Sequence, residues 1–288
     1  MIVVTGATGQ LGTALRQVLR NDAVFLTERD LDLADISAIR EVIESLKPSI
    51  LINAAAYTSV DLAEDERDLA MLINGEAVGV LAEVAADCKA RFVTVSTDYV
   101  FDGSADRPYV ESDQTNPINQ YGLSKEAGER ASIAANPESL VVRTSWLISG
   151  THPNFVETML RLGNTRELSI VDDQFGHPTL AIDLAEGIVG AVRAGASGIL
   201  HLTNQGVTSW FGLAREVAVL GGIDPERFQP CTSDEYPATA RRPRNSVLES
   251  ERISDLGLTR LRHYREGLAT VVGQLRGSMI GYHTNGVV

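Results

Sequence analysis

The chain is poor in the residues that build metal sites and disulfide frameworks. Its 288 residues include two cysteines, Cys88 and Cys231, and five histidines, and none of these has the spacing of a zinc site. We therefore expect two free thiols and no bound metal. The sequence also lacks an apolar run as long as a membrane span and a basic, apolar N-terminal leader, which favours a cytoplasmic protein without a membrane partner.

Positive charge is scarce as well. The chain has 25 Lys and Arg residues against 38 Asp and Glu residues, which gives a net charge of −13. Such an excess of negative charge opposes binding to the phosphate backbone of nucleic acids, so we expect no nucleic-acid partner. The one basic cluster, Arg241–Arg244 (RRPR), has two interpretations, a solvated loop or a local site for a small anion.

The chain does contain a regular alternation of apolar runs and amphipathic stretches. Strands are expected at Ile2–Val4, Ala23–Leu26, Ile50–Ile52, Phe92–Val95 and Leu140–Arg143. Helices are expected at Gly9–Leu19, Ile36–Leu46 and Gln120–Ala134, with an irregular helical region within Asp65–Asp87. Strands that alternate with helices are joined by crossovers and run parallel. The pattern therefore predicts an α/β fold with a doubly wound, Rossmann-like parallel sheet.

This rhythm changes after about Trp146. Residues 147–153 are expected to form a loop, and further helices are expected at Asn154–Leu162, Asp183–Arg193 and Ser209–Leu220, with a strand at Gly198–Leu202 that returns to the sheet. We predict a dinucleotide-binding domain of residues 1–146 with about 176–202, and a smaller C-terminal substrate-binding lobe of residues 147–175 and 203–276. The tail of residues 277–288 is glycine-rich and polar, a composition typical of disordered chain ends.

A glycine pattern follows the first strand. Residues 6–12 read GATGQLG and lead into an amphipathic helix. In a dinucleotide loop, Gly6 would permit the sharp turn, Gly9 would let the backbone approach a pyrophosphate, and Gly12 would allow the helix to pack closely on the strand. A purely structural turn is the alternative, but the position at the end of the first strand favours a dinucleotide cofactor.

The second and third strands leave the choice of cofactor open. Glu28 suits the ribose 2′-hydroxyl of NADH, whereas Arg29 suits the 2′-phosphate of NADPH. Asp32 and Leu33 could lie against the adenine, although a surface turn explains them equally well. The small residues of segment 53–56 (NAAA) leave room for a dinucleotide at the carboxyl end of the sheet, or else allow tight helix packing.

Three residues have the order required for the reduction of a carbonyl group. Thr97 follows the fourth strand, and Tyr121 and Lys125 stand four residues apart on the next helix, so that they share one face. Tyr121 could donate a proton to the carbonyl oxygen, Lys125 could lower the phenol pKa from its ordinary value of about 10, and Thr97 could orient the oxygen. After a glycine loop, this order predicts a nicotinamide-dependent reductase. The alternative is a chance pair on an exposed helix.

Six segments resemble the dTDP-4-dehydrorhamnose reductase family of the extended short-chain dehydrogenase/reductase superfamily. They are residues 6–12 (GATGQLG), 53–61 (NAAAYTSVD), 96–103 (STDYVFDG), 143–146 (RTSW), 173–179 (DQFGHPT) and 242–248 (RPRNSVL). The resemblance extends from residue 1 to about residue 270. It implies reduction of the 4-keto group of dTDP-4-dehydro-β-L-rhamnose to dTDP-β-L-rhamnose, the last step of dTDP-rhamnose synthesis for cell-surface polysaccharides. The family uses NADPH, and some members use NADH.

The resemblance also assigns site residues by position. Tyr121 would be the proton donor, Lys125 its pKa modulator and a ribose ligand, and Thr97 the partner of the carbonyl oxygen. The cofactor would contact Gly6, Gly9, Gln10, Leu11, Gly12, Asp32, Leu33, Ala56, Tyr57 and Thr58. The substrate, a nucleotide sugar, would contact Val60, Thr97, Asp98, Trp146 and Arg242, of which Arg242 would pair with its diphosphate. Core packing is the alternative for Trp146.

The sequence departs from the family pattern in two places. Segment 147–153 lacks the usual aromatic residue and glycine-rich turn, which leaves the exact sugar open. The first helix lacks the acidic residue through which some members share a metal ion, so we expect a monomer or a weak homodimer. The alternatives are another nucleotide-sugar reductase or epimerase of this fold, and a non-catalytic NADP-binding regulatory subunit. A dehydratase is disfavoured because Asp98 is followed by Tyr99 and not by a glutamate.

Overall fold

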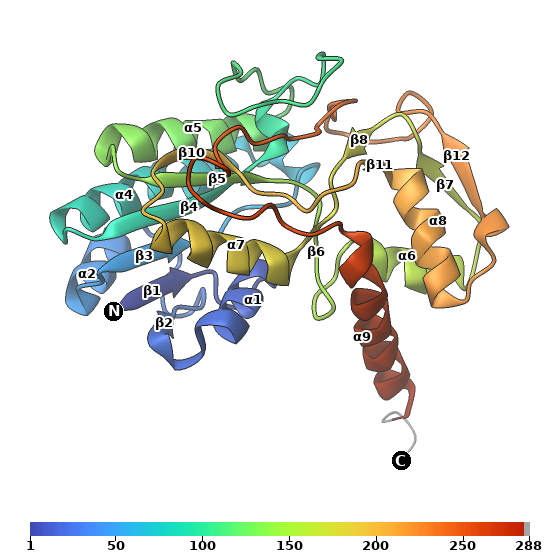
Figure 1. Ribbon diagram of the computed structural model, residues 1–288, viewed down its shortest axis with the longest axis horizontal. Helices are drawn as coiled ribbons and strands as arrows, with labels where there is room; N and C mark the ends of the chain where they lie inside the picture. The colour runs from blue at the N-terminus through green and yellow to red at the C-terminus, as the bar shows by residue number, and fades with distance from the viewer. Residues whose placement is uncertain (285–288) are drawn as a thin grey trace.

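The computed structural model describes residues 1–284 and is built around one six-stranded sheet (Figure 1). All of its strands run parallel, in the spatial order β10, β5, β4, β3, β1, β2. Their bounds are β1 (Ile2–Thr5), β2 (Ala23–Phe25), β3 (Ile50–Asn53), β4 (Arg91–Thr97), β5 (Leu140–Thr144) and β10 (Gly198–His201). This architecture confirms the doubly wound parallel sheet, including the late strand that returns to its edge.

Two layers of helices cover the sheet. Neighbouring residues on a strand point to opposite faces, and β1 shows the consequence. Val4 packs in a core formed with helices α1 and α7, whereas Val3 packs in a second core formed with α2 and α4. Both valines are fully buried. The bounds of the covering helices are α1 (Gln10–Leu19), α2 (Ile36–Leu46), α4 (Ala77–Asp87), α5 (Gln120–Ala135) and α7 (Ala181–Arg193).

The helical region between β3 and β4 is irregular, as its sequence predicted. It consists of α3 (Arg67–Met71), a π-helical turn η3 (Leu72–Glu76) and α4. Within residues 1–284, this is the one helical span long and apolar enough to cross a membrane. Half of its most apolar stretch is buried, and α4 packs against α5 and α2. Core packing therefore accounts for its apolar composition.

The later part of the chain builds a smaller helical layer beside the sheet (Figure 1). Its core contains Leu160, Leu213, Val217, Phe228 and Tyr264. The expected helices at 154–162 and 209–220 are confirmed. The bounds of the elements are β6 (Leu147–Ile148), α6 (Phe155–Gly163), β7 (Leu168–Val171), β8 (Phe175–Gly176), β9 (Thr179–Leu180), β11 (Thr208–Ser209), α8 (Trp210–Gly221), β12 (Phe228–Cys231) and α9 (Arg265–Thr284).

The structure differs from the sequence expectations in two segments. Residues 147–148 form the short strand β6, which pairs with β9, within the segment expected to be a loop. Helix α9 continues to Thr284, so residues 277–284 are helical and not disordered, and the rest of the predicted tail lies outside the described residues. The domain boundaries stay a prediction. Two residues of the predicted lobe pack against the dinucleotide-binding domain. Leu248 lies in one apolar cluster with Phe101, and Ile253 belongs to the core of α1 and α7.

Candidate active site

A buried hydrogen-bond network links the carboxyl ends of β1 and β3 to the middle of the neighbouring strand β4. The Thr5 hydroxyl donates to Asn53 Oδ1 at 2.7 Å, and Asn53 Nδ2 donates to Thr94 Oγ1 at 3.3 Å. The backbone N–H of Ala55 also donates to Asn53 Oδ1, at 3.2 Å. Parallel strands present their carboxyl ends at one edge of the sheet, where ligands of such folds bind. The network therefore gives this edge a fixed shape.

The glycine loop leaves a backbone surface open at this edge. Gly6 has φ +67°, and a Cβ there would lie 2.5 Å from Ala55 N, while a Cβ on Gly12 would lie 2.1 Å from Gly6 O. A Cβ on Gly9 would meet only Gly6 O, at 3.5 Å, so Gly9 faces open space. No described side chain caps α1, and its first turn holds no acid. Its exposed amides therefore fit the diphosphate of a dinucleotide.

A side chain of the π-helical turn η3 holds the loop after β3. This loop contains Ala56, Tyr57 and Thr58. The side chain of Asn74 accepts from Tyr57 N and donates to Tyr57 O, both at 2.9 Å. Asn74 Nδ2 also lies 3.0 Å from the Ser124 hydroxyl oxygen, and the asparagine is fully buried. The sequence analysis missed this residue, although a single Asn in an apolar helical stretch was a usable signal. Cofactor contacts of the loop stay a prediction.

The two residues expected beside the adenine form a turn. Leu33 is buried in the core that contains α2, and the exposed Asp32 accepts a hydrogen bond from Ala34 N at 2.8 Å. Both observations fit the surface-turn interpretation. An adenine contact stays a prediction for both residues.

The three candidate catalytic residues come together where β4 meets the start of α5. Thr97 ends β4 and is buried. Asn119 caps α5, since its Oδ1 accepts from Gly122 N at 2.7 Å, and this places Tyr121 and Lys125 in the first two turns. A Cβ on Gly122 would lie 2.2 Å from Tyr99 O, so glycine is needed for this close approach.

The ionisation of Tyr121 and Lys125 differs from the sequence expectation. Burial raises the pKa of Tyr121 to about 12, against the lowering effect of a hydrogen bond with Thr97. Lys125 Nζ donates to Val95 O at 2.6 Å, and burial lowers the pKa of this lysine to about 8. Burial therefore outweighs the groups that lower the phenol pKa, and the Lys125 ammonium is directed at the Val95 carbonyl oxygen. A phenol that stays protonated at neutral pH is nevertheless the form that a proton donor requires.

Asp98 contributes a buried carboxyl group next to this trio. The Thr97 hydroxyl donates to Asp98 Oδ1 at 2.9 Å, while Oδ2 is buried without a hydrogen-bond partner among residues 1–284. Burial raises the pKa of Asp98 to about 7, although the nearby hydroxyls of Ser246 and Thr97 act to lower it. A buried oxygen that lacks a partner is a suitable acceptor for a ligand hydroxyl.

The raised pKa of Asp98 predicts a pH-dependent cost in stability. The unfolded carboxyl ionises near its ordinary pKa of 3.8, so stability is lost as the pH rises from there through about 7, where the folded carboxyl also ionises. Asp98→Asn removes this loss. We expect the variant to unfold at a higher temperature than the wild type at about pH 8 and at nearly the same temperature near pH 4. A constant difference at all pH values would contradict the assignment.

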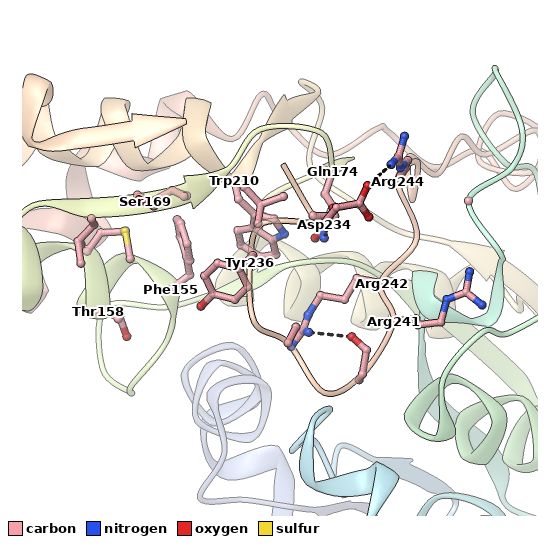
Figure 2. A pocket seen from close by; sticks show the side chains of 18 of the residues that line it. Phe155, Thr158, Ser169, Gln174, Trp210, Asp234, Tyr236, Arg241, Arg242 and Arg244 are labelled. Carbon is pink, nitrogen blue, oxygen red and sulfur yellow. Dashed lines mark hydrogen bonds and ion pairs between the residues drawn. The ribbon is translucent and has the colours of Figure 1, made fainter. Parts of the chain in front are cut away.

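A cavity of about 870 Å³ opens between the smaller layer and the basic cluster. Ile118, three residues before Tyr121, lines it, whereas the three candidate catalytic residues and Asp98 do not. Figure 2 shows Phe155, Trp210 and Tyr236 on one side of it and the arginines of segment 241–244 on the other. Because these arginines line a cavity, an anion site is favoured over a solvated loop.

Arg242 already has an acidic partner in this arrangement. Its guanidinium donates to both carboxylate oxygens of Asp61, at 2.7 and 3.1 Å, and its side chain is 21% exposed. The same ion pair holds the pKa of Asp61 below its ordinary value. Asp61 was not predicted as a site residue, although it ends segment 53–61. It sets the direction of the guanidinium, and diphosphate pairing stays a prediction, as does the contact of the neighbouring Val60.

Trp146 belongs to an aromatic stack. Its ring lies parallel to that of Trp210, with centroids 3.6 Å apart. The Phe155 ring packs on Trp210, with centroids 4.6 Å apart. The backbone of Trp146 has φ +44°, and a Cβ on Gly176 would lie 2.6 Å from its ring. Trp210 and Phe155 line the cavity, and the sequence analysis did not identify either. The packing interpretation of Trp146 is therefore supported, and a sugar contact stays a prediction.

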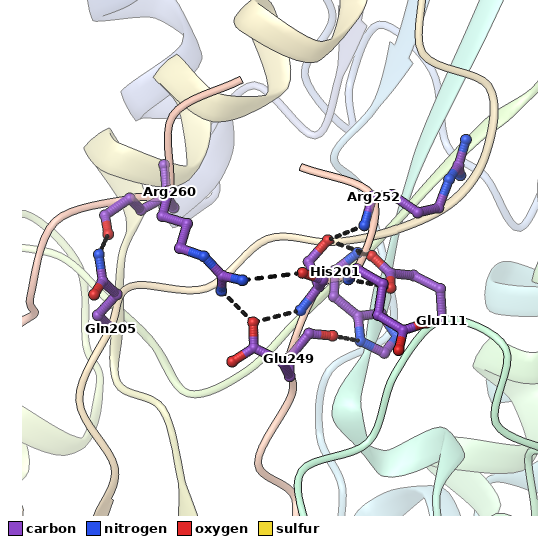
Figure 3. A network of polar contacts seen from close by, with 9 residues as sticks. Glu111, His201, Gln205, Glu249, Arg252 and Arg260 are labelled. Carbon is purple, nitrogen blue, oxygen red and sulfur yellow. Dashed lines mark hydrogen bonds and ion pairs between the residues drawn. The ribbon is translucent and has the colours of Figure 1, made fainter. Parts of the chain in front are cut away.

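A polar network lies at the ends of β5 and β10, and β5 pairs with β4 (Figure 3). Glu111 accepts from the backbone N–H of His201 at 3.1 Å, and His201 Nδ1 donates to Glu249 O at 2.9 Å. Burial lowers the pKa of His201 to about 4, so the ring is neutral at physiological pH. Behind it, Arg143 and Glu129 form a buried ion pair of 2.6 Å. The network attaches two loops to the sheet.

Among residues 1–284, no group of three or more His, Cys, Asp or Glu side chains is arranged to hold a metal ion. Cys88 and Cys231 are free thiols.

Comparisons by sequence and by structure converge on one family. A family model described as the RmlD substrate binding domain matches residues 1–276. A Streptomyces niveus protein named dTDP-4-keto-6-deoxy-D-glucose reductase is 43% identical, over 92% of this chain and 94% of its own. A Burkholderia thailandensis protein named dTDP-4-dehydrorhamnose reductase is 42% identical, over 88% of this chain and 92% of its own.

A solved structure gives the same result. The dTDP-4-dehydrorhamnose reductase of Bacillus anthracis in complex with NADP has a TM-score of 0.90 at 36% identity, and the match covers 94% of this chain and 97% of that one. The chain therefore belongs to the RmlD family of dTDP-4-dehydrorhamnose reductases.

Proposed function

We propose that the protein reduces the 4-keto group of dTDP-4-dehydro-β-L-rhamnose to dTDP-β-L-rhamnose with NADPH, the last step of dTDP-rhamnose synthesis. The observation that carries this proposal is the convergence of Thr97, Tyr121 and Lys125 at the same edge of the parallel sheet as the open glycine loop. A non-catalytic regulatory subunit would have no need for this trio.

Each residue of the site has a task in this reaction. NADPH, when bound, supplies the hydride for the carbonyl carbon. Tyr121 is protonated at neutral pH, because its pKa is about 12, and it donates its proton to the carbonyl oxygen. The Thr97 hydroxyl, whose proton points to Asp98 Oδ1, would turn that proton to the carbonyl oxygen and orient it. Lys125 is held beside the site through Val95 O and would bind the ribose hydroxyls of the cofactor.

The substrate side of the proposal uses the cavity. The diphosphate would lie against Arg242, whose planar guanidinium matches phosphate oxygens, and the sugar would lie near Trp146 and Asp98. A second candidate substrate is dTDP-4-keto-6-deoxy-D-glucose, because the Streptomyces niveus relative is named for it. Both sugars carry a ketone at the same carbon, so they require the same proton donor.

We further propose that the enzyme acts in the cytoplasm on a small nucleotide sugar, as a monomer or a weak homodimer. The net charge of −13 supports the absence of a nucleic-acid partner. The burial of the apolar helix at Arg67–Asp87 supports the absence of a membrane partner.

Purified protein mixed with dTDP-4-dehydrorhamnose is expected to oxidise NADPH, which is followed by its absorbance. Parallel reactions contain NADH in place of NADPH, or dTDP-4-keto-6-deoxy-D-glucose in place of the first sugar. The higher kcat/KM identifies the preferred cofactor and sugar. If neither sugar causes oxidation of either cofactor, the proposed function is wrong.

A further inference from the structure

Segment 147–154 contacts the glycine loop directly. His152 Nε2 lies 2.8 Å from the backbone carbonyl oxygen of Thr8, although the two residues are 144 positions apart in the sequence. A carbonyl oxygen only accepts hydrogen bonds, so Nε2 must carry the proton. In the neutral ring Nδ1 is then an acceptor, and the Thr151 hydroxyl lies 2.9 Å from it. Thr151 therefore orients the imidazole toward the loop.

The contact fixes one particular peptide group. The carbonyl of Thr8 and the N–H of Gly9 belong to the same peptide plane, and Gly9 N donates to Gly6 O at 3.1 Å. With His152 on the carbonyl, this plane is held at both ends. It immediately precedes the first amides of α1, which no described side chain caps. The orientation of this plane therefore helps to set the path by which the backbone enters α1.

The segment is itself braced. Asn154 caps α6, since its Oδ1 accepts from Val156 N at 2.9 Å, and its Nδ2 donates to the carbonyls of Ser149 and His152 at 2.8 and 2.9 Å. Longer contacts link the same segment to Gln10, which lies 3.3 Å from Asn154 Nδ2 and 3.4 Å from Leu147 O. The imidazole is thus presented from a closed loop on the substrate side of the molecule.

We propose that His152 is a positioning residue for the dinucleotide cofactor. From the substrate side it holds the Thr8–Gly9 peptide in the orientation that presents the amides of α1 to the cofactor diphosphate. The bond joins two protein groups and involves no cofactor atom, so the protein itself contributes to ordering the loop for binding. The inference rests on the proposed use of NADPH.

The test compares His152→Phe, which keeps a ring but loses the donor, with His152→Gln, whose side-chain N–H can still donate to Thr8 O. NADPH binding is measured by calorimetry without substrate, and its dissociation rate by stopped-flow fluorescence. We expect His152→Phe to raise Kd roughly three- to tenfold, mainly through faster dissociation, as for the loss of one hydrogen bond. His152→Gln is expected to stay within about twofold of the wild type.

The remaining outcomes are decisive as well. If His152→Phe binds NADPH as tightly as the wild type, or if both variants lose binding equally, the proposal is overturned. Should His152→Phe fail to fold, Thr151→Val keeps the imidazole but loses its orienting hydroxyl, and an unchanged Kd for that variant overturns the proposal too. A wild-type protein that binds NADPH but reduces neither keto sugar would contradict the proposed function and leave this inference standing.

Discussion

Replacing Tyr121 by phenylalanine is expected to lower kcat by about 10²–10⁴-fold, as for the loss of a general acid, while NADPH binding stays unchanged. The phenol keeps its proton at neutral pH, because burial raises its pKa to about 12. Without the hydroxyl, the oxygen of the reduced carbonyl would have to take its proton from water. NADPH oxidation in the presence of saturating keto sugar measures kcat, and calorimetry measures cofactor binding.

Tyr264→Phe is a matched control for this variant. The Tyr264 hydroxyl donates to Glu216 at 2.8 Å within the smaller layer, and its ring is fully buried. Its removal is expected to cost about 1 kcal/mol of stability and to leave kcat unchanged. If Tyr121→Phe lost cofactor binding and turnover together, a structural role would explain the residue, and the assignment as proton donor would be wrong.

Arg143→Met is expected to destabilise the fold by about 3–5 kcal/mol. Arg143 is 2% exposed and Glu129 4% exposed, and the guanidinium donates to both carboxylate oxygens at 2.8 and 2.6 Å. The substitution leaves Glu129 as a buried carboxylate without its counter-charge. Unfolding in denaturant, followed by circular dichroism, measures the loss.

A double variant separates the ion pair from the packing of its side chains. Arg143→Met combined with Glu129→Leu removes both charges and keeps apolar volume, so it is expected to recover most of the lost stability. If the double variant is less stable than Arg143→Met alone, the two substitutions act through packing, and the unpaired charge is not the cause.

The sheet could be predicted because its signals are local. Each buried strand is a short apolar run next to an amphipathic helix, and the glycine loop follows the first strand directly. The catalytic trio was predictable for a related reason. Thr97 ends a strand, while Tyr121 and Lys125 share one face of a helix, so sequence spacing alone brings them to the same edge.

Contacts between distant segments were beyond such reasoning. Asp61 and Arg242 are 181 positions apart, and no periodicity relates one to the other. The Trp146–Trp210 stack likewise depends on how the smaller layer sits beside the sheet. The direction of the pKa shifts of Tyr121 and Lys125 was also beyond such reasoning, because burial is their largest cause and burial is a property of the assembled fold.

The π-helical turn at Leu72–Glu76 places a constraint on chain length. Such a turn holds one residue more than a turn of α-helix, and here that surplus lets Asn74 support both Tyr57 and Ser124. A deletion of one residue in this stretch would restore a regular helix and rotate all preceding positions by about 100°. A substitution of one side chain here would disturb the core less than this rotation of the preceding helical positions. Descendants of this gene should therefore accumulate substitutions around the turn while conserving its number of codons.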